Sequence, residues 1–415
     1  MNKTVLEIAE GAKRAQRLLA KSGGQLRTDA LLAIAQALED NAEKIIAAND
    51  EDIKNARENG MSESMIDRLS LSKDRIYGMA QGAREVAAMA DPIGNVLWGE
   101  TRPNGLKLEK ISVPLGVVAI IYEARPNVTS DAAALCLKSG NAVILRGGKE
   151  AINSNKAVAD IMRDAVESKG LPRDSINLIE DTSRESANEL MRANGYVDVL
   201  IPRGGKGLIK SVVANATVPV IETGSGNCHT YVDKDADLNM AAEIVFNAKT
   251  SRTSVCNACE SLLIHKDVLK KALPMIYDKL KLKDVEIFGD ERVCEILPEA
   301  KHATEDDWGT EYLDYKISIK TVESVDEAIE HIAKYSTGHS ECIVTENYHT
   351  AQQFMREVDS SAVYVNASTR FTDGGEFGFG AEIGISTQKL HARGPLGLKN
   401  LTSEKYIIYG SGQIR

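Results

Sequence analysis

One cysteine of this sequence is well suited to nucleophilic chemistry. Cys256 lies in residues 251–259 (SRTSVCNAC), a run of small and polar residues between a predicted helix and a predicted strand. Arg252 lies four residues before it and Lys249 seven, so positive charge would lower the pKa of the thiol and populate the nucleophilic thiolate. The same residues also fit a buried cysteine that packs as a small hydrophobic side chain. The loop therefore makes Cys256 a candidate nucleophile.

Cys256 and Cys259 also form a Cys-x-x-Cys pair, a spacing found in zinc sites and in thioredoxin-like redox centres. A zinc site needs two further ligands, but the other four cysteines are scattered and contain no second such pair. A redox pair normally opens a helix, whereas this pair precedes a predicted strand. A cysteine hydrolase with His229 or His339 as its base is a further alternative, without a supporting local signature. We expect no metal site.

Two cationic, glycine-containing turns follow predicted strands, at residues 146–149 (RGGK) and 202–206 (PRGGK). The second turn also opens a predicted helix, where backbone N–H groups and the helix dipole can hold phosphate. Open α/β sheets bind ligands at the carboxyl ends of their strands, so the turns suit a nucleotide that carries an extra phosphate. Solvated surface loops are the alternative. Residues 224–226 (GSG) lack the third glycine of a dinucleotide-binding fingerprint, and residues 204–207 (GGKG) do not match a phosphate-binding P-loop.

The elements around these residues predict an α/β protein. Uninterrupted apolar runs at 117–121 and 142–145 are typical of strands buried on both faces, and helical stretches separate them. With further strands predicted at 176–179, 197–201 and 218–221, this alternation indicates a doubly wound parallel sheet. A second strand–helix series after Glu222 predicts a second α/β domain. About ninety residues before the first sheet are mostly helical, with a 3.6-residue apolar period from Leu31.

Composition and charge exclude several classes of protein. The 415 residues are 43% apolar, and 50 Lys and Arg against 60 Asp and Glu give a net charge of −10. Such an acidic chain lacks the excess of positive charge with which proteins bind nucleic acid or an anionic membrane surface. No apolar segment approaches the ~20 residues that span a bilayer. Six cysteines are too few for a disulfide scaffold, so we expect a cytoplasmic protein with reduced thiols.

Several long motifs resemble the aldehyde dehydrogenase superfamily and, within it, the gamma-glutamyl phosphate reductase family. The resemblance runs nearly collinearly along the whole chain. The segments that carry it are 113–117 (VPLGV), 121–129 (IYEARPNVT), 140–150 (GNAVILRGGKE), 201–205 (IPRGG), 222–229 (ETGSGNCH), the Cys256 loop, 374–387 (GGEFGFGAEIGIST) and 393–398 (RGPLGL).

This resemblance implies two doubly wound α/β domains and a small β oligomerisation arm. It implies a cofactor-binding domain over residues 1–225, with arm strands near 104–114. A catalytic domain over 226–367 would carry the nucleophilic cysteine, and residues 368–415 would form a return segment and the rest of the arm. The polar–apolar alternation of residues 106–109 suits such an arm, and a homo-oligomer is the expected assembly.

The resemblance also implies NADPH as the cofactor, glutamyl phosphate as the substrate and a place in proline biosynthesis, with the upstream glutamate kinase as a partner. It assigns catalysis to Cys256, to Glu222, which by itself fits either a cap or an acid/base, and to Asn127 as an oxyanion-hole amide. The cofactor-binding residues would be Arg146, Lys149, Arg203, Gly204, Gly205 and Glu311. Arg252, Arg125 and Arg370 are the candidate substrate ligands, because bidentate guanidinium groups suit oxyanions and each lies in a small or polar loop predicted near Cys256. A surface arginine is the alternative for each. The alternatives are a non-phosphorylating aldehyde dehydrogenase and a catalytically silent scaffold of the same fold.

Overall fold

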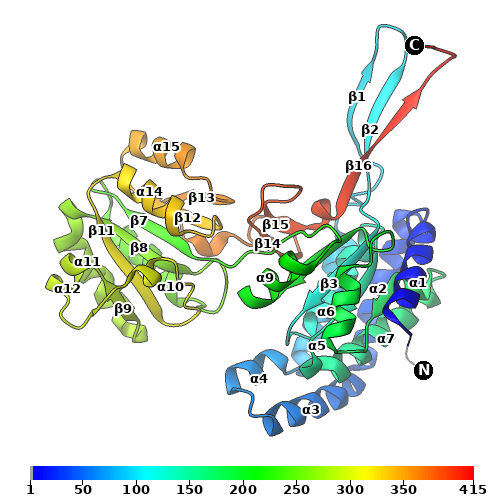
Figure 1. Cartoon of the computed structure of the whole chain (residues 1–415), viewed down its shortest axis with the longest axis horizontal. Helices are drawn as coiled ribbons and strands as arrows, with labels where there is room; N and C mark the ends of the chain where they lie inside the picture. The colour runs from blue at the N-terminus through cyan, green and yellow to red at the C-terminus, as the bar shows by residue number, and fades with distance from the viewer. Residues whose placement is uncertain (1–2) are drawn as a thin grey trace. The chain divides into compact units, whose positions relative to one another are not determined.

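The computed structural model describes residues 3–415, which form two compact units (Figure 1). Unit 1 contains the chain up to Thr223, together with Gly378–Gly384 and Leu396–Arg415. Unit 2 contains Gly224–Phe377 and Ile385–Pro395. The predicted domain boundary lies between residues 225 and 226, and the predicted return segment begins at residue 368. Within residues 3–415, no helix combines the length and the hydrophobicity needed to cross a membrane.

Unit 1 is built around a four-stranded parallel sheet in the order β5-β4-β3-β6. The strands are β3 (Val117–Tyr122), β4 (Ala142–Arg146), β5 (Ile176–Leu178) and β6 (Val199–Arg203). All six residues of β3 are buried, which explains its continuous apolar sequence. The parallel sheet and the helices between its strands confirm the predicted α/β fold class.

Helices cover both faces of this sheet. On one face, α1 (Val5–Leu19), α8 (Arg184–Met191) and α9 (Lys206–Asn215) pack against alternate residues of β3 and β4. Helices α6 (Asn127–Lys138) and α7 (Ile152–Ser168) also contact the strands, and α2 (Gly24–Asp40) packs against α5 (Lys73–Ala88), α6 and α7. Two further helices, α3 (Ala42–Glu58) and α4 (Glu63–Leu69), complete the predicted helical N-terminal region.

The strand predicted at residues 218–221 is wrong. The structure has only an isolated parallel bridge there, between Leu200 and Val220. Leu200 N donates to Pro219 O at 2.9 Å, and Ile221 N donates to Leu200 O at 3.0 Å. Pro219 has no N–H to donate, so the segment cannot extend this bridge into a regular ladder.

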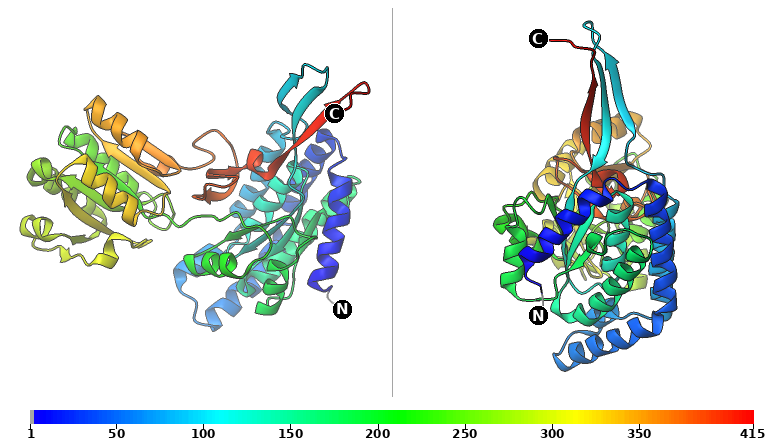
Figure 2. Two further views of the ribbon diagram at one scale, coloured as in Figure 1. Left: turned by 45° about the horizontal axis from the view of Figure 1, so that its top comes forward. Right: turned by 90° about the vertical axis from the view of Figure 1, so that its right-hand side faces the viewer.

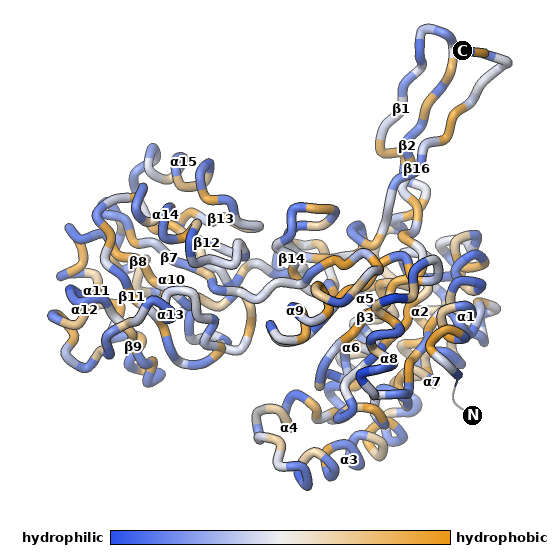
Figure 3. Tube along the Cα trace, viewed as in Figure 1, coloured by the Kyte–Doolittle hydropathy of each residue, from blue (hydrophilic) through white to orange (hydrophobic). Residues whose placement is uncertain are grey.

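A three-stranded antiparallel sheet forms the arm. Its order is β1-β2-β16, with β1 (Val96–Thr101), β2 (Lys107–Pro114) and β16 (Thr402–Tyr409). The arm projects away from the parallel sheet of unit 1 (Figure 2). Hydrophobic segments occur along its strands (Figure 3), although β1 is exposed throughout. The predicted strands therefore exist, and their role in association stays a prediction.

Unit 2 contains a seven-stranded parallel sheet in the order β10-β9-β11-β8-β7-β12-β13. Its strands are β7 (Cys228–Val232), β8 (Cys259–His265), β9 (Glu286–Gly289), β10 (Lys301–His302), β11 (Lys316–Val322), β12 (Ser340–Val344) and β13 (Ala362–Val365). One apolar cluster joins alternate strand residues to α10 (Leu238–Thr250) and α11 (Lys266–Leu280), near α12 (Glu291–Ile296). A second cluster joins the other strand residues to α14 (Val325–Tyr335) and α15 (Tyr348–Glu357). The sheet is therefore covered on both faces, as predicted for a second α/β domain.

Short elements complete the chain. Helix α13 (Glu305–Trp308) precedes β11, and β14 (Glu382–Ser386) pairs with β15 (Gly394–Gly397) in a two-stranded sheet.

Candidate active site

Cys256 lies in the loop of unit 2 that joins the end of α10 at Thr250 to the start of β8 at Cys259. The six cysteines are all free thiols, and only Cys256 and Cys294 are half-buried rather than buried. A half-buried thiol on a loop between two packed elements is accessible to a substrate while its backbone is held. This is the setting expected of a nucleophile.

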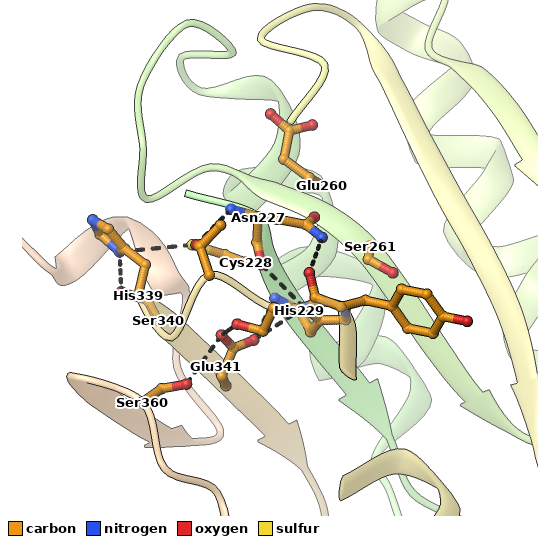
Figure 4. Close-up of polar contacts among 12 residues, drawn as sticks. Asn227, Cys228, His229, Glu260, Ser261, His339, Ser340, Glu341 and Ser360 are labelled. Atoms are coloured by element: carbon orange, nitrogen blue, oxygen red, sulfur yellow. Dashed lines mark hydrogen bonds and ion pairs between the residues drawn. The ribbon is translucent and has the colours of Figure 1, made fainter. Parts of the chain in front are cut away.

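The backbone of Cys256 is held from β7. Cys228 Sγ donates a hydrogen bond to Cys256 O at 3.1 Å. The same sulfur lies 3.7 Å from His339 Nδ1 (Figure 4). A Cβ atom at Gly226 would lie only 1.4 Å from Cys256 O, so the two backbones approach as closely as glycine alone permits. These contacts fix the position of the nucleophile loop (residues 251–258), which is named after the candidate nucleophile Cys256.

Glu311 also contacts this region of unit 2. It is half-buried in the loop between α13 and β11, and its Oε1 accepts a hydrogen bond from Gly226 N at 2.7 Å. The structure therefore connects Glu311, predicted as a cofactor ligand, to the glycine that packs against the Cys256 backbone.

Two of the three predicted substrate arginines lie close to Cys256. Burial lowers the pKa of Arg370 most, the charge of Arg252 lowers it further, and a Cys256 thiolate opposes both effects, so the three groups share one electrostatic environment. Arg370 Nε donates to Ser251 Oγ at 3.0 Å, and Arg370 Nη1 donates to Asn257 Oδ1. The guanidinium is thereby tied to both ends of the nucleophile loop.

Lys249 has a different role from the one its spacing suggested. Its ammonium forms an ion pair with Glu260, and both side chains are fully buried. Glu260 Oε1 also accepts a hydrogen bond from Leu313 N at 3.2 Å. The charge of Lys249 is therefore compensated by Glu260. The Arg370 guanidinium, in contrast, interacts electrostatically with Cys256 and with Arg252. The pair joins the end of α10 to the start of β8, on either side of the nucleophile loop.

The Cys-x-x-Cys alternatives gain no support. Cys259 is fully buried, and its thiol donates to Ser261 O at 3.4 Å within β8. Among residues 3–415, no group of three or more His, Cys, Asp or Glu side chains is arranged to hold a metal ion.

The two histidines of the hydrolase alternative lie in the same buried polar cluster (Figure 4). His229 Nδ1 lies 3.1 Å from Asn227 O and 3.3 Å from Glu341 Oε2. His339 Nδ1 lies 2.8 Å from Ser340 Oγ, and burial lowers the pKa of His339 to about 4. Fully buried rings with these partners are poorly placed to exchange a proton with a substrate.

Unit 1 carries the other two predicted catalytic residues, Asn127 and Glu222, and the predicted substrate ligand Arg125. Arg125 lies in the loop between β3 and α6, and Asn127 is the exposed first residue of α6. Asn127 Nδ2 donates to Asp131 Oδ2 at 3.0 Å, so this amide is oriented by the first turn of its own helix. Glu222 is half-buried and precedes Thr223, whose hydroxyl donates to Pro202 O at 2.6 Å.

The first cationic turn, residues 146–149, lies beside buried hydrogen-bond donors that have no partner among the described residues. Arg146 ends β4, and its Nη2 donates to Thr182 O at 2.7 Å and to Ser183 O at 2.9 Å. Its Nε and the Nδ2 of Asn155 are buried without a hydrogen-bond partner among the described residues. A Cβ at Gly147 would lie 2.2 Å from that Asn155 nitrogen, and Lys149 is exposed beside this turn. Donors of this kind are suited to a polar ligand.

The second cationic turn already holds a carboxylate. Gly205 caps α9, and its N–H donates to Glu123 Oε2 at 2.8 Å. A Cβ at Gly204 would lie 2.5 Å from the same oxygen. Arg203, at the end of β6, is half-buried. Because β3 lies between β4 and β6, the two cationic turns follow strands that are separated by one strand.

The structure thus brings the predicted residues together in two groups. Unit 2 groups Cys256 with Arg252, Arg370 and, through Gly226, Glu311. Unit 1 places its candidates at the carboxyl ends of β3, β4 and β6, and these are Arg125, Asn127, Arg146, Lys149, Arg203, Gly204 and Gly205. Sequence reasoning missed the roles of Ser251, Asn257, Cys228, Glu123 and Asn155. Only Asn257, a polar residue directly after the nucleophile, carries a signal in the sequence.

Comparison with known proteins agrees with this description. The sequence model of the aldehyde dehydrogenase family matches residues 1–292. Gamma-glutamyl phosphate reductases of Clostridium novyi and Lachnospira eligens are 61% and 60% identical to this chain, and each alignment covers 99% of both proteins. The crystal structure of gamma-glutamyl phosphate reductase from Thermotoga maritima is 49% identical, with a TM-score of 0.98 over 100% of both chains.

A more distant structure shows how widely the fold is shared. An acetylating aldehyde dehydrogenase from Geobacillus thermoglucosidasius has a TM-score of 0.71 at 19% identity, covering 99% of this chain and 97% of its own. That likeness concerns the fold alone, whereas the high identities extend over nearly the whole chain. The chain belongs to the gamma-glutamyl phosphate reductase family, within the aldehyde dehydrogenase superfamily.

Proposed function

We propose that this protein reduces L-glutamate 5-phosphate to L-glutamate 5-semialdehyde and phosphate, with NADPH as the reductant, in proline biosynthesis. Family membership over nearly the whole chain supports the reaction. The observation that carries the chemistry is the half-buried Cys256 thiol beside two arginines, because an acyl phosphate needs a nucleophile for its carbonyl and cations for its oxyanions.

In the first step, the Cys256 thiolate attacks the acyl carbonyl. A C–S bond forms, the C–O bond to phosphate breaks, and phosphate leaves with the bonding electron pair. Covalent capture divides one difficult reaction into two easier ones. The backbone N–H of Cys256 and the Asn127 amide are the proposed donors to the developing oxyanion.

When bound, NADPH would supply the hydride that reduces the thioester carbonyl. The residues proposed to hold it are Arg146, Lys149, Arg203, Gly204, Gly205 and Glu311. The buried, unpartnered Arg146 Nε and Asn155 Nδ2 beside the narrow Gly147 turn fit a polar ligand of this kind. The exposed Lys149 ammonium fits the 2′-phosphate.

Product release returns the protein to its starting state. The C–S bond of the Cys256 adduct breaks, the aldehyde leaves, and the electron pair remains on the Cys256 sulfur. Glu222 is the proposed carboxylate of the site. Since phosphate takes the place of water in this chemistry, Glu222 is not required to activate a hydrolytic water.

Arg252, Arg370 and Arg125 are the proposed ligands of the substrate oxyanions. The hydrogen bonds from Arg370 to Ser251 and Asn257 of the nucleophile loop support this assignment most directly. Planar guanidinium groups bind carboxylate and phosphate with two parallel hydrogen bonds.

We also propose that copies of this chain associate through the arm. Its strands expose apolar side chains that water solvates poorly, and these include Val96, Leu97, Trp98, Tyr406 and Ile408. The molecular mass in solution tests this, and a monomer at micromolar concentration would contradict it.

The reverse reaction offers a direct test of the function. NADP reduction is followed with glutamate semialdehyde, with and without inorganic phosphate. Reduction that requires phosphate is expected, because phosphate must release the acyl group from Cys256. Phosphate-independent reduction would instead support a non-phosphorylating aldehyde dehydrogenase. Absence of turnover, with no alkylation of Cys256 by iodoacetamide at neutral pH, would support a silent scaffold.

A further inference from the structure

Asn257, the residue directly after the nucleophile, uses its whole side-chain amide within unit 2. It is buried, and its Nδ2 donates to Arg370 O at 3.1 Å and to Thr372 O at 3.0 Å. Its Oδ1 accepts from Arg370 Nη1. The Asn257 carbonyl accepts from Thr369 Oγ1 at 2.8 Å. One residue thus binds both the backbone and the guanidinium of the segment that carries Arg370.

This pattern matches the chemistry of asparagine. Two N–H donors face two carbonyls, and one amide oxygen faces a guanidinium. An aspartate would oppose two carbonyls with a carboxylate, and an alanine would remove the donor from both carbonyls, of which that of Thr372 is buried. Ser251 Oγ also fixes the guanidinium, because it accepts from Arg370 Nε at 3.0 Å. These two hydrogen bonds, from Nε and Nη1 of Arg370, set the plane of the guanidinium. An oxyanion of the substrate would bind to other N–H groups of the same guanidinium.

The segment that follows Arg370 is also held in place, through the side chain of Thr372. Thr372 Oγ1 lies 2.6 Å from Ser340 Oγ and 2.6 Å from Tyr364 OH. The Asn257 amide therefore bridges the nucleophile loop to a rigid segment rather than to a free loop. The position of Arg370 relative to Cys256 depends on this bridge.

We propose that Asn257 is a positioning residue that holds the Arg370 guanidinium beside Cys256 to bind an oxyanion of the substrate. This inference rests on the proposed function, because it assigns Arg370 a ligand of the same reaction. Both the phosphate group and the α-carboxylate of the substrate have the required chemistry. In the reverse reaction they arrive on separate molecules, inorganic phosphate and glutamate semialdehyde, so their KM values identify which one Arg370 binds.

A double-mutant cycle tests the proposal with the full-length protein. The variants are N257A, R370A and N257A/R370A, and S251A removes only one of the two guanidinium contacts. A hydrogen bond to a charged group corresponds to a change of roughly 10- to 100-fold, so R370A should raise one of the two KM values by that amount. N257A should raise the same KM at least severalfold and S251A less, with little change in kcat. In the R370A background, N257A should change that KM less than about twofold, because its effect acts through the guanidinium.

Asn141 of unit 1 provides the matched control. It is buried, its Nδ2 donates to Ser139 Oγ and Leu401 O at 2.8 Å, and its Oδ1 accepts from Gly116 N at 2.8 Å. N141A should lower the thermal midpoint as N257A does, yet leave both KM values unchanged. Equal effects of N257A with and without Arg370, or the same KM change in N141A, would overturn the inference while the proposed function stands. A wild-type protein without phosphate-dependent activity would refute the proposed function, and the inference with it.

Discussion

The Glu123 carboxylate accepts a hydrogen bond from the backbone N–H of Gly205, at the N-terminus of α9. This N–H belongs to the turn at residues 202–206, whose backbone donors are predicted from the sequence to bind a phosphate of the cofactor. A carboxylate at that point shows that the turn accommodates an anionic oxygen, and it would compete with any phosphate for the same donor.

We therefore expect Glu123→Ala to lower the KM for NADPH. Removing a charge at a helix N-terminus corresponds to about 0.3–1 kcal/mol, or roughly a two- to fivefold change. Steady-state kinetics with varied NADPH measures it. Glu58→Ala, at an exposed position of α3, makes the same change in net charge and serves as the control. An increased KM in E123A would mean that Glu123 supports the cofactor rather than competes with it.

Cys256→Ser should abolish turnover and leave NADPH binding intact, because serine cannot supply a thiolate at neutral pH. Reductase activity and fluorescence titration of NADPH report the two properties separately. Cys294→Ser is the matched control, since Cys294 is the other half-buried thiol and donates to Gly289 O at 3.5 Å in another part of unit 2. Substantial activity in C256S would rule out the covalent route.

Arg146→Ala with Lys149→Ala should weaken NADPH binding far more than NADH binding. Loss of one charged hydrogen bond corresponds to roughly tenfold or more in affinity. Because Arg146 also holds Thr182 O and Ser183 O, its removal disturbs the local fold, whereas Lys149 is exposed. The single variant K149A therefore isolates the charge, and the ratio of the two KM values measures it. Equal losses for NADH and NADPH would show that this turn does not recognise the extra phosphate.

Regular elements with strong sequence patterns were predicted closely. The strands predicted at 117–121 and 142–145 lie within β3 and β4, each of which extends one residue further, because a continuous apolar run reports burial on both faces directly. The failure at residues 218–221 has a local cause that the sequence itself contains, because Pro219 lacks the N–H donor that a regular ladder needs.

The contacts of the site were harder to predict, because they join residues far apart in the chain. Asn257 and Arg370 are 113 residues apart, and nothing near either residue identifies the other. Lys249 illustrates the same limit. Its distance from Cys256 in the sequence suggested a free positive charge, but Glu260 compensates that charge inside the fold. Residue type and spacing identify a candidate nucleophile, whereas its electrostatic surroundings depend on tertiary contacts.

The buried Lys249–Glu260 pair should contribute strongly to the stability of unit 2. Burial raises the pKa of Glu260 to about 7 even though Lys249 opposes that shift, so removing Lys249 leaves a carboxyl group that is costly to ionise. We expect Lys249→Met to destabilise the protein by about 3–5 kcal/mol in urea unfolding, as breaking a buried ion pair typically does. The double variant K249M/E260L should regain much of this loss, since it removes both buried charges. A double variant no more stable than K249M would mean that packing, and not charge, causes the loss.

His339 should make the stability of the protein depend on pH in the acidic range. Burial lowers the pKa of His339 from 6.5 to about 4, so between these values the unfolded chain binds a proton that the folded protein excludes. Stability from this group is therefore complete above pH 6.5 and is lost as the pH falls towards 4, by about 3 kcal/mol. His339→Asn removes the titration, so the free energies of unfolding of wild type and variant should converge by that amount between pH 7 and 4. Both are measured by urea unfolding at several pH values, and the buried His331 is present in both proteins and cancels from the difference. Parallel pH profiles would show that the His339 ring titrates alike in the folded and unfolded states.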